Sequence, residues 1–176
     1  MNIRSIGGDI ADVAPDHAEC AALWLRSGFN MRFSTWRFKF MDANRELVAL
    51  DRRTEPERPW LSGSDSLWEL RPSIRRLRYL YVFSNPDDAH AYRGLHAVNA
   101  AVTRCLDRMS MIGVKSVAFI HIPAVENNAI PTAEDDLKSA REMLGAISTW
   151  QADHAETGIE VVLVDRTDDF ADLLRE

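Results

Sequence analysis

The chain has 176 residues, of which 46% are hydrophobic and 27% are charged, and its formal net charge is −6. This length and composition are typical of a single soluble globular domain with a buried core. The acidic balance argues against non-specific nucleic-acid binding, which needs a basic surface.

The sequence carries no pattern of membrane insertion or export. No apolar run approaches the roughly 20 residues of a membrane-spanning helix, and the opening MNIRSIGG lacks the basic-then-apolar pattern of a signal peptide. Cys20 and Cys105, both in segments that we expect to be helical, are interpreted as buried thiols rather than as a disulfide or a metal pair. We therefore expect a cytoplasmic protein without a membrane partner.

The first half of the sequence predicts mixed local structure. Gly7 and Gly8 end a short strand, and Gly28 ends a helix. Aromatic residues that alternate with polar ones, followed by a turn and an apolar run, predict an antiparallel hairpin. In chain order the predicted elements are a strand over 1–8, a helix over 16–27, hairpin strands over 33–40 and 47–50, a polar loop over 51–65, and a short helix or irregular turn over 66–77.

The second half predicts strands that alternate with helices. Continuous apolar runs indicate buried strands, and Gly113 and Gly158 end two segments with helical spacing. Thr132 is the expected N-cap of the second helix, with Asp135 three residues later as in a capping box. The predicted elements are a strand over 79–83, a helix over 88–112, a strand over 117–120, a helix after 132, a strand over 159–164 and a short helix over 170–174.

This alternation of strand and helix is typical of right-handed crossovers in a parallel sheet. Continuously apolar strands fit a sheet that is covered on both faces, whereas the hairpin of the first half adds antiparallel strands. The sequence therefore predicts one domain over residues 1–176, a three-layer α/β/α fold with a mixed, partly parallel central sheet.

Four segments, in their order along the chain, resemble macrodomains. They are GGDI at 7–10, CLDRMSMIG at 105–113, GVKSVAF at 113–119 and IEVVLVD at 159–165. Macrodomains bind ADP-ribose and related nucleotides, and some hydrolyse ADP-ribose linkages. The resemblance implies a macrodomain-like fold, and it implies that Asp9 holds the amino group of an adenine, with Ile10 beside it.

The sequence departs from the family's pattern in two places. The family has a strand and an Asn-Ala-Ala-Asn element after Gly-Asp-Ile, whereas here a helix is predicted and the similar VNAAV at 98–102 falls inside another helix. The family's phosphate loop is glycine-rich, whereas HIPAVENNA at 121–129 has no glycine. Pro123 lacks an N–H donor, and Glu126 adds negative charge. A nucleotide would therefore have to bind in a non-standard way.

The candidate binding residues lie where predicted strands end. If the strands over 79–83, 117–120 and 159–164 run parallel, their carboxyl ends meet in one crevice. His121 either acts there as a general base or contacts a ligand. The alternative is a half-buried histidine whose ring is hydrogen-bonded to the backbone. Asp9 is either the adenine contact or a residue that caps the next helix. The predicted ligand-binding residues are Asp9, Ile10, Ser84, Asn85, His121, Ala124, Val125, Glu126, Asn127 and Asn128.

Catalytic and metal-binding residues are harder to assign. No nucleophile, base and orienting acid follow from spacing. His90 and His96 are too far apart for one helical face, so a metal site is not expected. Asp165 also ends a strand, and it either contacts a ligand or has a structural role, in which it starts a turn or caps the last helix.

Four arginines gather in the segment 71–78 close to Trp68. The guanidinium groups of arginines can bind a phosphate, and the face of an aromatic ring can stack on a nucleobase. The alternative is a solvated face on which the arginines pair with Asp65 and Glu69. The four residues are Arg71, Arg75, Arg76 and Arg78.

Two functional hypotheses follow from these patterns. The first is a macrodomain-like module that binds ADP-ribose or another nucleotide, with at most an ADP-ribosyl hydrolase-like activity and no cofactor. The second is a protein-interaction module with a degenerate pocket, which contacts its partner through the aromatic hairpin and the arginine cluster. The first predicts an open pocket at the strand ends, and the second predicts a filled one.

Overall fold

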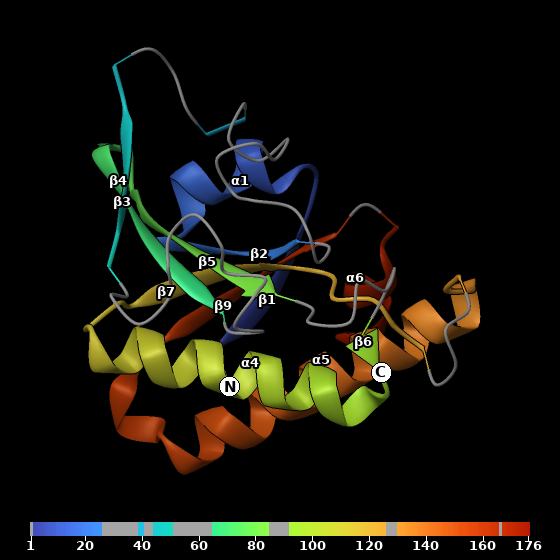
Figure 1. Ribbon diagram of the computed structural model, residues 1–176. Coiled ribbons are helices and arrows are strands. Elements are labelled where there is room, and N and C mark those ends of the chain that lie inside the picture. Colours follow the sequence, from blue (N-terminus) through green and yellow to red (C-terminus); the bar gives the residue numbers. More distant parts are fainter. Residues whose placement is uncertain are drawn as a thin grey trace.

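The computed structural model is a three-layer arrangement of helices around one mixed sheet (Figure 1). This architecture confirms the predicted fold class. No described helix is long and apolar enough to span a membrane. The structure describes residues 2–25, 39–40, 44–50, 65–84, 92–125, 130–165 and 167–176.

Seven described strands make up the sheet. From one edge to the other they are β1 (Ile3–Gly7), β9 (Glu160–Asp165), β7 (Ser116–Ile120), β2 (Cys20–Leu25), β5 (Leu77–Ser84), β4 (Ser66–Ile74) and β3 (Glu46–Ala49). The first five run parallel, and β4 and β3 continue the sheet in antiparallel fashion. The predicted parallel direction of β5, β7 and β9 is therefore right. However, β2 separates β5 from β7, so the end of β5 is not beside the other two.

Helices cover both faces of the sheet. The long helices α4 (Leu95–Met111) and α5 (Ala133–Asp153) pack on one face, and the short α1 (Ile10–His17) packs on the other (Figure 1). The last helix, α6 (Asp169–Leu173), contacts α5, β1 and β9. A small parallel pair of β6 (Tyr92–Arg93) and β8 (Ala124–Val125) and a 3-10 turn (Ala155–Thr157) complete the described elements.

Side chains that alternate along the central strands fill two cores. On β2, Cys20 and Ala22 pack on the α4 and α5 side, while Ala21 and Leu23 pack on the α1 side. All four are fully buried. Burial on both faces explains the continuous apolar runs of the parallel strands, because neither face meets water.

Local signals set the ends of α5 and α4. Thr132 and Asp135 form the predicted capping box, which satisfies backbone N–H groups at the start of α5. The helix predicted over 88–112 begins only at Leu95, after Gly94 with its positive φ of 81°. Tyr92 and Arg93, which we expected to be helical, form β6 instead.

The helix predicted over 16–27 is wrong. Helix α1 begins earlier and ends at His17, and Cys20–Leu25 form the central strand β2. The alanines within this range are divided between two elements, because Ala18 is the C-cap of α1 whereas Ala21 and Ala22 lie in β2. Ala14 and Ala18 at the end of α1 pack with Ala21 of β2 in the same core. Small side chains on both elements allow the helix to approach the sheet closely. Cys20 is therefore in a strand, although it and Cys105 are the free, buried thiols that we expected.

The short helix or irregular turn predicted over 66–77 is also wrong. This segment contains β4 and the turn into β5, an antiparallel hairpin. Its turn carries Arg75 with a φ of 53°, a conformation that glycine or asparagine usually adopts, so no turn signal is visible in the sequence.

The predicted aromatic hairpin is only partly described. The run 47–50 corresponds to β3, which pairs with β4. Residues 33–38 and 51–64 lie outside the described residues. Lys39 and Phe40, the end of the predicted strand, are helical instead, and Phe40 is buried against the α1 face of the sheet.

Candidate functional site

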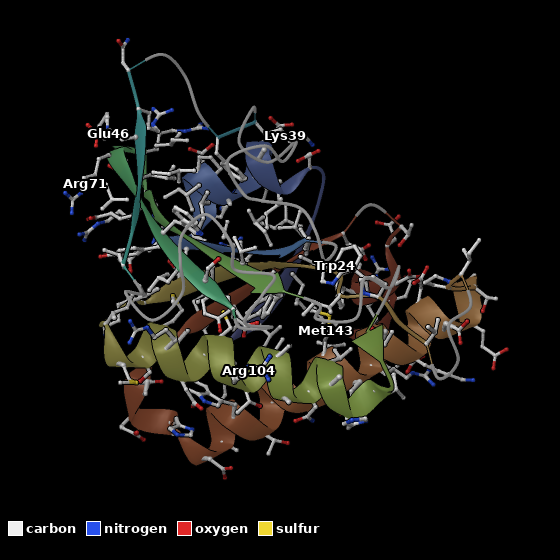
Figure 2. The ribbon with its side chains drawn as sticks, viewed as in Figure 1. Trp24, Lys39, Glu46, Arg71, Arg104 and Met143 are labelled. Carbon is white, nitrogen blue, oxygen red and sulfur yellow. The ribbon has the colours of Figure 1, made fainter. Side chains whose placement is uncertain are left out.

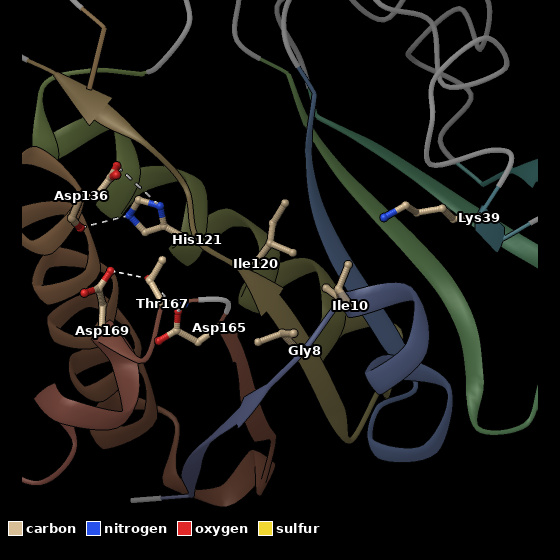
Figure 3. A pocket seen from close by; sticks show the side chains of 10 residues that line it. Gly8, Ile10, Lys39, Ile120, His121, Asp136, Asp165, Thr167 and Asp169 are labelled. Carbon is tan, nitrogen blue, oxygen red and sulfur yellow. Dashed lines mark hydrogen bonds and ion pairs between the residues drawn. The ribbon is translucent and has the colours of Figure 1, made fainter. Parts of the chain in front are cut away.

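A cavity of about 450 Å³ opens where β1, β9 and β7 end (Figure 3). Its volume falls within the roughly 300–1,000 Å³ of small-molecule sites. Its position at the carboxyl ends of parallel strands is where open α/β sheets bind their ligands. Ile10, Ile120 and Val164, which follow or end these strands, form its apolar wall.

The connection from β1 to α1 forms one side of the cavity. Gly8 lines it and donates its N–H to the carbonyl oxygen of Asp165 at 3.0 Å. Its φ is 139°, and a Cβ atom added at this position would lie 3.0 Å from a Val13 methyl group, so a larger side chain would be strained here. Glycine therefore allows the chain to turn tightly at the cavity edge.

Asp9, between two residues that line the cavity, acts as a helix cap. Its Oδ1 accepts the Ala11 N–H at 3.0 Å, and its Oδ2 forms an ion pair with Lys39. This is the capping role that the sequence left open. Contact with an adenine stays a prediction. Lys39, which no motif indicated, lines the cavity itself.

His121 stands at the end of β7 against the first turn of α5. Its Nε2 lies 3.1 Å from the carbonyl oxygen of Asp136. A carbonyl oxygen only accepts, so Nε2 carries the proton, and the Nδ1 of a neutral ring is left as an acceptor. The ring meets Phe170 edge-on at 6.1 Å between centroids.

The ionisation of His121 depends on opposing effects. Burial lowers its pKa below the usual value, and the carboxylates of Asp136, Asp169 and Asp165 oppose this shift without reversing it. The imidazole is therefore neutral at pH 7, and it does not balance the charge of these three carboxylates.

Asp165 is buried at the end of β9 and organises the start of α6. Its Oδ1 accepts the Thr167 N–H at 2.9 Å, and its Oδ2 accepts the Phe170 N–H at 2.7 Å. The Thr167 hydroxyl lies 3.1 Å from Asp165 Oδ1 and 2.6 Å from Asp169 Oδ2. Asp165 thus has the expected structural role at the start of the last helix.

Asp136 has different surroundings. Its carboxylate is 39% exposed, and its Oδ1 lies 3.9 Å from His121 Nδ1, beyond hydrogen-bonding distance. Within the described part of the chain it accepts no hydrogen bond from a backbone or side-chain donor. It therefore has free acceptor positions at the edge of the cavity.

Few of the predicted binding residues line this cavity. Ile10 and His121 do. Ser84 ends β5, which β2 separates from β7. Asn85 and the stretch Glu126, Asn127 and Asn128 lie outside the described residues.

Ala124 and Val125 do not line the cavity either, because they are buried in β8. The chain after His121 is held against α5 by two contacts. The Ser139 hydroxyl donates to the Ile122 carbonyl, and the Ile122 N–H points at the sulfur of Met143 at 3.3 Å (Figure 2 labels Met143). These contacts attach the segment to α5.

The arginine cluster lies on β4, on β5 and in the turn between them, and none of its four residues lines the cavity (Figure 2 labels Arg71). Arg71 pairs with Glu69, as one interpretation expected, and Arg75 pairs with Asp16. Trp68 is 1% exposed, so its face cannot stack on a ligand. The expected pairing with Asp65 is wrong for this cluster. That carboxylate accepts from Arg104 and from the Tyr81 hydroxyl.

The described residues of the cavity include no cluster of metal-binding side chains. Across the described ranges, no group of three histidine, cysteine, aspartate or glutamate side chains could hold a metal ion. Both thiols are buried, and burial raises their pKa, so neither is a ready thiolate nucleophile.

Comparisons with solved structures support the same fold. The chain is similar to the Trypanosoma brucei macrodomain in complex with ADP-ribose, with a TM-score of 0.64 and 12% identity over 97% of this chain and 66% of that one. The ADP complex of the same protein gives 0.63 with 12% identity and the same coverage. The macro domain of ganglioside induced differentiation associated protein 2 gives 0.55 with 14% identity, over 98% of this chain and 82% of that one.

At the level of sequence, the chain matches no protein-family model and no curated protein. At such low sequence identity, the structural similarity establishes a macrodomain-like fold but does not establish a ligand or an activity. The chain also spans only 66% of the length of the T. brucei chain that it resembles.

Proposed function

We propose that the cavity at the ends of β1, β9 and β7 binds ADP-ribose or another nucleotide. The observation that carries this proposal is the open cavity of about 450 Å³ at the ligand-binding edge of a macrodomain-like sheet. The T. brucei macrodomain with the same kind of fold has been crystallised with ADP-ribose and with ADP.

The chemistry of the lining suits the parts of a nucleotide. Ile10, Ile120 and Val164 offer an apolar surface to a base. The acceptors Nδ1 of His121 and the carboxylate of Asp136 suit the hydroxyl groups of a sugar. Lys39 offers an ammonium group to a phosphate, although it would have to share its donors with Asp9.

The alternative, a protein-interaction module, expects a filled crevice and exposed aromatic residues. The cavity is open, and Trp68 and Phe40 are buried, while the other aromatic residues of the predicted hairpin lie outside the described residues. Both observations favour the nucleotide over a protein partner. Binding without turnover is the simpler proposal, because both thiols are buried and Nε2 of His121 is bonded to backbone.

Calorimetric titration of the full chain with ADP-ribose, ADP and AMP tests the proposal. We expect saturable binding at one site. Replacement Ile120→Trp fills the cavity and should abolish binding, whereas Ile130→Trp, at a side chain that is 77% exposed and does not line the cavity, should not change it. Thermal melting checks that both variants fold. Absence of binding to all three compounds, or equal binding by both variants, would overturn the proposal.

A further inference from the structure

Both ring nitrogens of His121 face a single residue, Asp136. Nε2 lies 3.1 Å from the backbone carbonyl oxygen of Asp136, and Nδ1 lies 3.9 Å from its carboxylate Oδ1 (Figure 3). The bond to the carbonyl oxygen keeps the proton on Nε2, so the neutral ring has a lone pair at Nδ1. Nδ1 and Oδ1 are therefore two neighbouring acceptors with no proton between them.

This pair of acceptors belongs to the wall of the cavity. Both side chains line it, and they are partly exposed, by 28% for His121 and 39% for Asp136. Two acceptors cannot bond to each other, but each can accept from a donor group of a ligand. Neighbouring hydroxyl groups of a sugar supply two such donors. The pair suits them only while the imidazole is neutral.

A proton on Nδ1 would change the chemistry of the pair. It removes the lone pair of the ring and turns Nδ1 into a charged donor that faces the carboxylate of Asp136. The charged N–H attracts Oδ1 across the gap of 3.9 Å, and a small rotation of the half-exposed carboxylate brings it within hydrogen-bonding distance. Both acceptors are then used by each other rather than by a ligand.

We infer that a proton and the ligand compete for the acceptors His121 Nδ1 and Asp136 Oδ1, so that the site holds its ligand at neutral pH and releases it in acid. This inference rests on the proposed nucleotide function and concerns the regulation of the same site. The ligand group that it names is a sugar with free hydroxyl groups, which donate hydrogen bonds to the pair.

The surroundings of His121 set the pH at which the proton wins. Burial lowers the pKa of the imidazole below its ordinary value of 6.5. Carboxylates from three elements oppose this shift, namely Asp136 of α5, Asp169 of α6 and Asp165 of β9. Arg166, the next residue in the sequence, lies outside the described residues. The ring is therefore neutral at pH 7, and competition by the proton begins below about pH 6.5.

The affinity of the full chain for ADP-ribose, measured by calorimetry from pH 8 to pH 5, tests this competition. Neither phosphate of ADP-ribose is terminal, so both keep their charge over this range, whereas a phosphate monoester such as AMP titrates near pH 6. We expect a constant dissociation constant down to about pH 6.5. Below the pKa of His121 it should rise by about tenfold per pH unit, as for competition with one proton. Attraction of the anionic ligand to a protonated histidine predicts the opposite, tighter binding in acid.

Two variants and a control assign the pH dependence to this pair. His121→Asn keeps an acceptor but gains no proton, so its dissociation constant should not change with pH. Asp136→Asn removes a carboxylate that raises the pKa of His121, so the rise should begin at a lower pH. The matched control is His96→Asn, an exposed histidine in the first turn of α4 that does not line the cavity, and it should keep the original profile. Circular dichroism at each pH checks that the proteins are folded.

The outcomes separate this inference from the proposed function. If ADP-ribose binds equally at all pH values, or more tightly in acid, competition with the proton is wrong while nucleotide binding stands. A rise that persists in His121→Asn would also overturn the inference, because another group would then carry the proton. If ADP-ribose binds at no pH, the proposed function fails and takes this inference with it.

Discussion

Aspartate side chains have different roles in two regions of the cavity, its floor and its rim. We call Asp165 and Thr167 the floor, and Asp136 and His121 the rim. On the floor, the carboxylate is buried and its oxygens accept backbone N–H groups. On the rim, the carboxylate is half-exposed and accepts no such bond from the described residues. A carboxylate that holds a helix end is part of the fold, whereas one with free acceptors is available to a ligand.

The largest expected effect is on the floor. Replacement Asp165→Ala leaves the Phe170 and Thr167 N–H groups without their acceptor, and it should lower the free energy of unfolding by about 3 kcal/mol. Urea denaturation measures this change. The control Asp172→Ala, on the exposed side of the same helix, should stay within about 0.5 kcal/mol. Equal effects of the two substitutions would show that the floor is not structural.

A pH-dependent effect is expected from His121 on the rim. Its pKa in the folded chain lies below the ordinary value of 6.5, so the unfolded chain binds the proton more readily. Stability should therefore be full above about pH 6.5 and should fall as the pH decreases toward the lower pKa of the folded state. Urea midpoints between pH 8 and pH 5 measure this loss. The variant His121→Asn should show a flatter profile, and an unchanged profile would contradict the assignment.

The smallest effect on stability is expected for Asp136. Replacement Asp136→Asn removes no hydrogen bond seen in the described chain, so the free energy of unfolding should change by about 0.5 kcal/mol or less. Any effect should therefore appear in ligand affinity. A loss of stability as large as that of Asp165→Ala would remove the distinction between floor and rim.

The second half of the fold could be predicted because its signals are local. The order from β5 through α4, β7 and α5 to β9 follows from apolar runs, from helical spacing and from the capping box at Thr132. In the first half, β1 and β3 follow from local signals, but β2 and β4 do not. Cys20–Leu25 contain alanines that favour a helix, and they become a strand only because β5 and β7 flank them. Neighbours from distant parts of the chain decide such a segment.

Two residues that line the cavity were predicted as ligand-binding residues, for different reasons. His121 was predicted because it follows a strand, and Ile10 was predicted because the segment GGDI resembles macrodomains. Lys39 and Asp136 were missed, because one comes from a segment predicted as a hairpin strand and the other resembles an ordinary acidic residue in the first turn of a helix. No local pattern marks a residue that reaches a cavity from another layer.

The sequence by itself determined the class of the fold and the edge of the sheet where ligands are expected, because both follow from the spacing of apolar residues along the chain. The tertiary structure decided which side chains meet at that edge. Packing against α5 turns Ala124 and Val125 into buried strand residues, while it places Asp136 beside His121. Contacts of this kind join residues from separate elements, and they arise only when the layers come together.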